Sequence, residues 1–185
     1  ETKLIGEWMM ADAEKAWGLR WAGLRYFNVA GAGWDDLGDM ATLNLIPMVL
    51  DRLSKGETPK IFGTDYPTPD GTCVRDYIHV KDLAGAHIAA LDYLAGGQDM
   101  AEHIFNVGTG QGASVREVVS KVIASTGLDL EPEELARRAG DPPQLIGNAT
   151  RIGEFLGWKA EHDLDDIVTS SYTSWQADPN RPHFG

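Results

Sequence analysis

Segments with strand character alternate with segments of helical periodicity along nearly the whole sequence. Short apolar runs typical of buried strands occur at residues 19–27, 60–62, 74–80 and 103–107. Apolar residues recur at helical spacing at residues 4–17, 45–53, 83–94, 114–125, 148–157 and 163–175. This alternation predicts an α/β fold, in which helices cover a largely parallel sheet.

Capping residues mark the ends of several predicted helices. Gly18 follows the first apolar stripe, where a left-handed C-cap glycine is common. The tetrapeptide 114–117, Ser-Val-Arg-Glu, has the spacing of a capping box. Asn148 and Asp163 are predicted N-caps of the last two helices, and Gly157 is predicted to end the first of these.

Composition excludes several classes of protein. The chain has 185 residues, a hydrophobic fraction of 43%, a formal net charge of −12 and one cysteine, Cys73. The apolar fraction is too high for a disordered chain, and no run of about 20 apolar residues predicts a membrane span. The acidic balance argues against nucleic-acid binding. A single cysteine fits a reducing cytoplasm, and the sequence lacks Cys/His spacing for zinc, so we expect no metal.

The first residues have an unusual pattern. The chain begins with Glu1 and enters a helical pattern at once, without an initiator methionine or a signal sequence. We interpret this as a chain that starts inside a helix, so we expect a preceding part of the fold and partly exposed side chains at Trp8 and Met9.

One glycine-rich segment resembles a dinucleotide-binding loop without matching it. The segment 108–112, Gly-Thr-Gly-Gln-Gly, follows a predicted strand and precedes a predicted helix. The dinucleotide fingerprint is G-x-G-x-x-G with an acidic residue about 20 positions later. Asp129 is suitably placed, but the third glycine comes one residue early. We therefore favour a tight turn that requires small residues and positive φ.

Four segments together resemble one enzyme family. They are Leu-Arg-Tyr-Phe-Asn at 24–28, Ile-Phe-Gly-Thr-Asp-Tyr-Pro-Thr-Pro-Asp-Gly-Thr at 61–72, Val-Arg-Asp-Tyr-Ile-His-Val-Lys-Asp-Leu at 74–83, and Phe-Asn-Val-Gly-Thr-Gly-Gln-Gly at 105–112. In this order they resemble the C-terminal half of UDP-glucose 4-epimerases, which belong to the extended short-chain dehydrogenase/reductase superfamily. The resemblance extends over the whole chain.

The resemblance implies a division of the chain. Residues 1–30 would be the last helix and strand of a Rossmann-type NAD-binding domain. Residues 31–185 would mainly form the smaller α/β domain that binds the UDP-sugar, with about 75–95 packing back on the NAD-binding domain. The expected activity is interconversion of UDP-galactose and UDP-glucose through a 4-keto intermediate, with NAD as cofactor.

Two residues are expected near the cofactor. In this family a tyrosine and a lysine four residues apart lie on one helix face, and the lysine stabilises the tyrosinate and binds the nicotinamide ribose. Lys3 matches the lysine, and the tyrosine would lie two residues before Glu1. Phe27 matches the residue beside the nicotinamide.

The resemblance also assigns residues to the substrate. Arg75 and Arg138 match arginines that hold the diphosphate, which guanidinium groups bind in a bidentate manner. The alternative for Arg75 is an ion pair with Asp76 or Asp82, and for Arg138 an exposed charge. Asn44 could cap a helix and contact phosphate. The full expected set is Asn28, Asn44, Leu45, Lys60, Ile61, Phe62, Arg75, Arg138, Asp141 and Leu145.

Within this set the resemblance implies different roles. Lys60, Ile61 and Phe62 match a strand along the uracil, whose backbone contacts the base. Asp141 matches a ligand of the ribose hydroxyls. Leu145 lines the hexose pocket in the family, where a small residue admits N-acetylated sugars.

Alternatives to the epimerase remain open. One is a sibling nucleotide-sugar dehydratase or decarboxylase, and another is a non-catalytic UDP-sugar-binding module. We also expect a cytoplasmic protein that forms a homodimer at full length. The five histidines and Cys73 show no catalytic arrangement, so we expect structural or surface roles for them.

Overall fold

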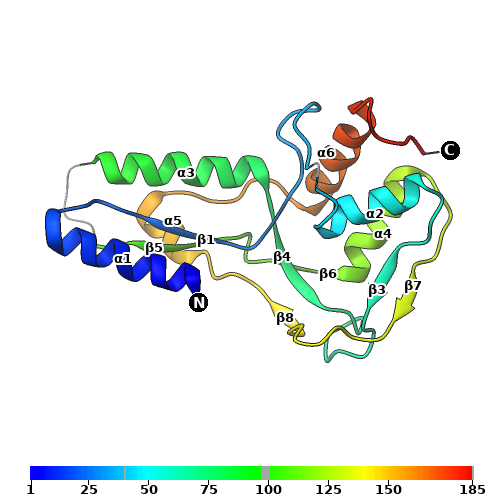
Figure 1. Cartoon of the computed structure of the whole chain (residues 1–185), viewed down its shortest axis with the longest axis horizontal. Coiled ribbons are helices and arrows are strands. Elements are labelled where there is room, and N and C mark those ends of the chain that lie inside the picture. Colours follow the sequence, from blue (N-terminus) through cyan, green and yellow to red (C-terminus); the bar gives the residue numbers. More distant parts are fainter. Residues whose placement is uncertain (40, 97–100, 185) are drawn as a thin grey trace.

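The computed structural model describes residues 1–39, 41–96 and 101–184 (Figure 1). Helices and strands alternate along this part of the chain, so the predicted α/β class is confirmed. The helices are α1 (Thr2–Trp17), α2 (Leu45–Ser54), α3 (Val80–Ala95), α4 (Val115–Thr126), α5 (Thr150–Leu156) and α6 (Leu164–Ala177). The strands are β1 (Gly23–Tyr26), β2 (Asn28–Ala30), β3 (Lys60–Phe62), β4 (Val74–His79), β5 (Ile104–Val107), β6 (Gly112–Ser114), β7 (Glu133–Leu135) and β8 (Gln144–Leu145).

The molecule has two lobes joined through β4 (Figure 1). One lobe holds α1, α3 and α5 around the parallel pair β1 and β5. The other holds α2, α4 and α6, with the parallel pair β3 and β7 at its edge. Each lobe is built around its own cluster of buried apolar side chains. The predicted division into residues 1–30 and 31–185 stays a prediction.

Strand β4 contributes to both cores because successive side chains of a strand point to opposite faces. Tyr77 packs in the cluster formed by α2, α4 and α6, whereas Ile78 packs in the cluster with Phe105 and Val107 of β5. The strand therefore fixes the position of one lobe against the other.

The pairing of β4 changes along its length. Its N-terminal half lies between antiparallel β6 and parallel β8, with Arg75 opposite Ala113 and Leu145. Its C-terminal half pairs in parallel with β2, and this register places Asn28 opposite Tyr77. Segments far apart in the sequence therefore meet along one strand.

Several predicted caps are confirmed. Gly18 ends α1 at a left-handed φ of 73°, and Gly157 ends α5 at 65°. The Asp163 carboxylate accepts the Asp166 N–H, and Asp166 completes a capping box at the start of α6. At the start of α4, Ser114 Oγ accepts the Glu117 N–H, which is one of the two bonds of the predicted capping box.

The predicted N-cap Asn148 was wrong by one residue. Ala149 is the N-cap of α5, and Asn148 instead accepts the Thr150 N–H from one residue further out, at 3.0 Å. An asparagine side chain can bond the backbone two residues on in a turn as well as in a cap, so the sequence alone did not fix the helix start.

The apolar run 19–27 forms a shorter strand than predicted. Only Gly23–Tyr26 pairs with β5, and the chain then shifts its pairing at Phe27 so that β2 joins β4. Trp21, before the strand, is buried and stacks on His103 with ring centroids 4.8 Å apart. Part of the run 19–27 is therefore apolar because its side chains are buried, and not because its backbone pairs as a strand.

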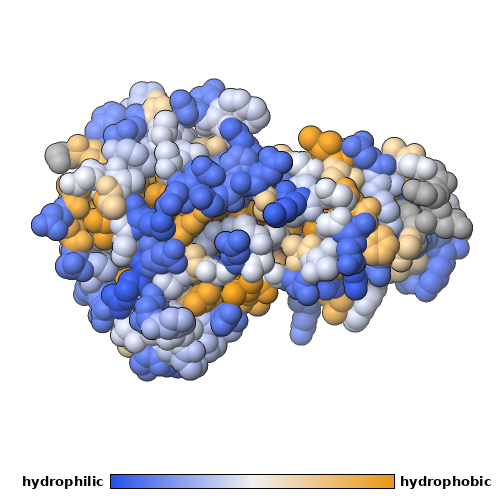
Figure 2. All heavy atoms as spheres, turned by 180° about the vertical axis from the view of Figure 1, so that it is seen from behind, coloured by the Kyte–Doolittle hydropathy of each residue, from blue (hydrophilic) through white to orange (hydrophobic). Residues whose placement is uncertain are grey.

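Helix α1 exposes most of its apolar residues. Among its residues only Ala13 is buried. The exposed large apolar side chains of α1 are Leu4, Ile5, Trp8, Met9, Met10 and Trp17. Ile88 and Leu91 of α3 are also exposed, at 62% and 64%, and Leu91 belongs to the apolar pattern at residues 83–94. Apolar surface is visible on this lobe in Figure 2.

The described residues include neither a membrane-crossing helix nor a metal-binding cluster of side chains. No helix in these ranges is both long enough and apolar enough to cross a membrane. No group of three or more histidine, cysteine, aspartate or glutamate side chains in the same ranges is arranged to hold a metal ion.

Candidate functional site

A cavity of about 300 Å³ lies between β2, β4, α2 and β3, and we call it the central cavity. Its walls come from segments that are far apart in the sequence. Eight of the ten predicted substrate residues line it: Asn28, Asn44, Leu45, Lys60, Phe62, Arg75, Arg138 and Asp141. The sequence order does not bring these residues together, so their convergence results from the fold.

The pairing of β2 with β4 forms one wall. Arg75 and Tyr77 are two residues apart on β4 and therefore share a face, and Asn28 lies opposite Tyr77 in the register. Burial raises the pKa of Tyr77 to about 12, and the positive charge of Arg75 and a hydrogen bond with Asn28 oppose this rise only in part. The phenol is therefore neutral at physiological pH, and Tyr77 lines the cavity.

Asp141 joins the two predicted phosphate-binding arginines. Its Oδ1 lies 3.8 Å from Arg75 Nη2, and its Oδ2 accepts from Arg138 Nε at 3.0 Å. Arg75 Nη1 also donates to the carbonyls of Val74 and Pro142, at 2.9 Å each. The Arg75 side chain is only 14% exposed, and that of Arg138 is 63% exposed.

These contacts identify the ion-pair partners of the two arginines. The ion-pair partner of Arg75 is Asp141, so the suggested partners Asp76 and Asp82 were wrong. Arg138 is an exposed charge, and its guanidinium lies 5.2 Å from the ring centroid of Phe62. Two cations sharing one carboxylate leave a net positive charge at this wall, which attracts anions.

Helix α2 forms the opposite wall and begins at the cavity. Asn44 is its N-cap residue, but the predicted side-chain capping bond was wrong. The Asn44 Nδ2 instead donates to Asp39 Oδ2 at 2.7 Å. Because no side chain in the described ranges caps α2, the N–H groups of Leu45 and Ile46 keep the capacity to bind an anion from the cavity.

Strand β3 lines the cavity with alternate side chains. Lys60 and Phe62 face it, whereas the Ile61 side chain is fully buried in the core. Within the described ranges, β3 pairs only with β7, so its second edge has no strand partner. The predicted contact of Ile61 with a ligand is therefore restricted to its backbone.

Leu145 does not line the central cavity. It lies on the two-residue strand β8, is 50% exposed, and neighbours Arg75 only through the strand register. Strands β8 and β2 pair with the same edge of β4, one after the other. Leu145 therefore lies along the edge of β4 that also borders the central cavity.

The two residues predicted near the cofactor lie outside the central cavity. Phe27 precedes the cavity residue Asn28, and its half-buried ring packs against the backbone of Gly147. A Cβ atom at residue 147 would lie 2.4 Å from that ring, so glycine makes room for it. Lys3 is exposed in the first turn of α1. A flat ring and a free ammonium fit the nicotinamide end of NAD.

The glycine-rich segment 108–112 forms the predicted tight turn. It joins β5 to β6, and Gly110 has a φ of +73°. The buried Asp76 carboxylate accepts the N–H groups of Thr109 and Gly110, at 2.9 and 3.1 Å, together with the Thr109 hydroxyl. The amides that would face a phosphate in a dinucleotide-binding loop are therefore occupied by this carboxylate.

Sequence reasoning missed several residues of the cavity wall. Tyr77 follows Arg75 at strand spacing, so the period-2 rule contained the signal that would have found it. Cys73 is buried at the same wall. Asp39, Leu43 and Ser171 also line the cavity. No sequence signal predicted these three, because their positions depend on how α6 packs against the segment before α2.

Known proteins resemble this chain in sequence along most of its length. A family model described as NAD dependent epimerase/dehydratase family matches residues 1–108. The chain belongs to this family. A UDP-glucose 4-epimerase of Azospirillum brasilense is 48% identical over 179 residues, which are 95% of this chain and 51% of that protein.

Solved structures show the same fold. A UDP-glucose 4-epimerase of Brucella ovis in complex with NAD aligns with a TM-score of 0.84 and 42% identity, covering 92% of this chain and 53% of that one. The Bifidobacterium longum enzyme with NAD⁺ and UDP aligns at 0.81 and 37%, covering 96% and 54%. The fold is therefore of the Rossmann-containing epimerase type, and the chain spans about half the length of these relatives.

Proposed function

We propose that this chain is the UDP-sugar-binding part of an NAD-dependent UDP-glucose 4-epimerase. The observation that carries the proposal is the convergence of Asn28, Asn44, Arg75, Arg138 and Asp141 on the central cavity. Two arginines and the uncapped start of α2 suit a diphosphate. The free edge of β3, next to Phe62, suits a base.

The chain's own residues would divide the work of binding. Arg75 and Arg138 anchor the diphosphate, and Asp141 orients both arginines while it offers its remaining acceptor capacity to the ribose. The sugar then extends along the edge of β4 toward Phe27 and Leu145. Because the anchors hold only the nucleotide end, the sugar stays free to present either face during the reaction.

Residues outside the central cavity would serve the cofactor end. NAD, when bound, accepts and returns the hydride at the sugar C4 position. Lys3 would orient the nicotinamide ribose and favour the tyrosinate form of a tyrosine four residues earlier. Phe27 would pack beside the nicotinamide. We further propose a cytoplasmic enzyme that dimerises through the apolar surface of α1, since exposed apolar patches mark interfaces.

The test is interconversion of UDP-galactose and UDP-glucose by the protein at its full natural length. We expect conversion in both directions without added reductant. Release of a dehydrated or decarboxylated sugar nucleotide would instead assign the sibling activities. Binding of UDP without any turnover would assign a binding module, and absence of UDP binding would refute the central cavity as the nucleotide site.

A further inference from the structure

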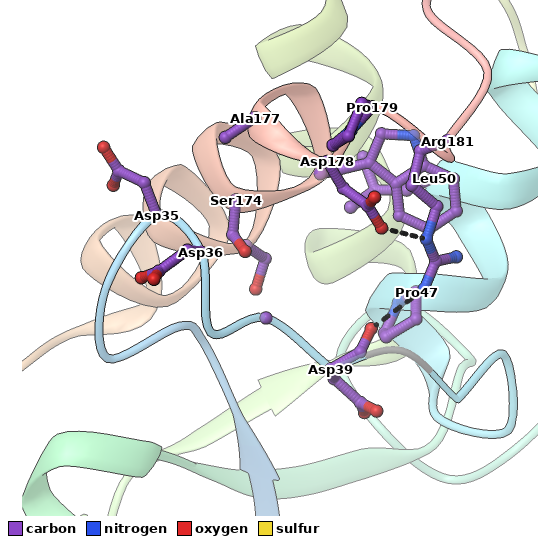
Figure 3. A pocket seen from close by; sticks show the side chains of 13 residues that line it. Asp35, Asp36, Asp39, Pro47, Leu50, Ser174, Ala177, Asp178, Pro179 and Arg181 are labelled. Carbon is purple, nitrogen blue, oxygen red and sulfur yellow. Dashed lines mark hydrogen bonds and ion pairs between the residues drawn. The ribbon is translucent and has the colours of Figure 1, made fainter.

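Arg181 lies in the turn that follows α6, next to a second pocket of about 210 Å³ (Figure 3). Its guanidinium stacks on Trp175, 4.0 Å from the ring centroid, and its Nε lies 3.5 Å from Asp178 Oδ2. Its Nη2 donates to the backbone carbonyl of Asp39 at 3.3 Å. Only 10% of the side chain is exposed, so three contacts hold this cation in one orientation.

Asp39 links this contact to the central cavity. Its carbonyl accepts from Arg181, while its carboxylate oxygens accept from the Ala41 N–H at 2.9 Å and from Asn44 Nδ2 at 2.7 Å. Asp39 and Asn44 both line the central cavity. The bond to Asp39 uses one N–H of the Asn44 amide, so the other N–H and the carbonyl oxygen remain available for a ligand.

Helix α6 also contacts the chain segment before Asp39 at two positions. Ser170 Oγ accepts the Ala32 N–H at 3.2 Å. Gly38 lies directly against Ser174, because a Cβ atom at residue 38 would be 2.2 Å from the Ser174 Oγ. The segment before α2 therefore packs on α6, and Arg181 holds it at Asp39, five residues before Asn44.

We propose that Arg181 is a positioning residue, which orients Asn44 toward the nucleotide diphosphate by holding the backbone of Asp39. This inference rests on the proposed function and deepens it. Arg181 does not line the central cavity, so its effect on ligand binding passes through Asp39 and Asn44.

The experiment measures the Kd of UDP by calorimetry with the protein at its full natural length. We expect Arg181→Ala to raise the Kd roughly three- to tenfold, as for the loss of one hydrogen bond. Arg181→Lys retains the charge and one donor, so it should recover part of the affinity. Asn44→Ala should weaken binding by itself, and adding Arg181→Ala to it should change the Kd by less than twofold.

The matched control is Lys121→Ala. The Lys121 ammonium also forms an ion pair with a residue of α6, Asp165, at 2.5 Å. Lys121 does not line the central cavity. It should leave the Kd unchanged. Melting temperatures of all variants ensure that affinities are compared between folded proteins.

The outcomes distinguish the proposed function of the chain from the positioning role of Arg181. If the unmodified protein does not bind UDP, the proposed function fails. If it binds UDP and Arg181→Ala leaves the Kd unchanged, or if the effects of Arg181→Ala and Asn44→Ala simply add, Arg181 is not a positioning residue. Non-additive losses support it, because a residue of purely structural importance would lower the melting temperature without coupling to Asn44.

Discussion

At the scale of single residues, the two arginines of the central cavity differ in burial, and this difference predicts a difference in effect. Arg75→Ala should weaken UDP binding by about 1.5–3 kcal/mol, because it removes a charged group that is mostly buried beside the diphosphate site. Arg138→Ala should weaken UDP binding by a smaller free energy, since 63% of that side chain is exposed. Calorimetry with UDP measures both.

The control for the arginine variants is Arg151→Ala. Arg151 forms an exposed ion pair with Glu102 at 3.2 Å and does not line the central cavity. Its removal tests whether loss of any positive charge from this acidic protein weakens binding. Equal losses for Arg75→Ala and Arg151→Ala would contradict the specific role of Arg75.

Asp76 is a residue whose substitution should affect folding before it affects binding. It is fully buried and accepts N–H groups from Thr109, Gly110 and Gly147, as well as a hydroxyl. Asp76→Ala should lower the free energy of unfolding by roughly 3 kcal/mol or more, because several buried donors lose their acceptor.

Urea denaturation measures the Asp76 effect, with Asp165→Ala as the control. Asp165 is exposed and forms an ion pair with Lys121, so its removal should change the free energy of unfolding by about 1 kcal/mol at most. A similar small loss for Asp76→Ala would show that the turn at 108–112 does not depend on this carboxylate.

At the scale of elements, His79 joins β4, α3 and α6. It is the N-cap of α3, where its Nδ1 accepts the Lys81 N–H, and its Nε2 lies 3.0 Å from Ser170 Oγ. These contacts require the neutral ring with its proton on Nε2. Burial lowers the pKa of His79, and the neighbouring His162, stacked at 4.4 Å, lowers it further.

The sign of the pH dependence follows from this lowered pKa. Above pH ~6.5, the pKa of an unfolded histidine, His79 is neutral in both states and its contribution to stability is complete. As the pH falls below that value, the unfolded state takes up the proton first, and the free energy of unfolding should decrease. Denaturation between pH 7.5 and 5 measures this decrease.

A variant isolates the contribution of His79. His79→Asn keeps an acceptor at the N-cap but does not titrate, so its stability should fall less steeply below pH 6.5. The exposed His183, changed to Asn, is the control and should keep the original slope. Identical slopes for all three proteins would exclude His79 as the source.

The sequence predicted which segments are helices or strands better than it predicted which segments contact one another. Gly18, Gly157 and Asp163 marked helix ends correctly, because caps act within one turn. The side-chain bond of Asn44 was mispredicted because its partner, Asp39, competes with the helix for the amide. Local rules cannot evaluate that competition, which depends on how the preceding segment is seated on α6.

At the scale of the whole molecule, the central cavity was predictable only through family resemblance. Periodicity placed Arg75 on a strand, but the partner Asp141 and the wall residue Ser171 required the tertiary structure. Likewise, the apolar pattern of α1 predicted a helix correctly, but the exposure of Trp8 and Met9 was expected from the inferred preceding segment and not from periodicity. Exposure depends on the neighbouring element, which periodicity does not identify.

One lobe contributes most of the predicted substrate-binding residues, whereas the other contributes few of the residues predicted for catalysis. We therefore predict that substrate binding can be separated from catalysis. The central cavity contains anchors for a diphosphate, whereas the cofactor end offers only Lys3 and Phe27 among the predicted residues. The 185-residue chain by itself should therefore bind UDP without interconverting UDP-galactose and UDP-glucose. Calorimetry and a chromatographic assay of the two sugar nucleotides measure these properties.

The control for this prediction is the same chain carrying Arg75→Ala, which should lose the UDP affinity and thereby locate the binding in the central cavity. The exposed apolar surface of α1 favours self-association, so light scattering should accompany both assays. Turnover by the purified chain would contradict the need for a tyrosine four residues before Lys3. Absence of UDP binding in a folded chain would instead show that the central cavity requires contacts from outside these 185 residues.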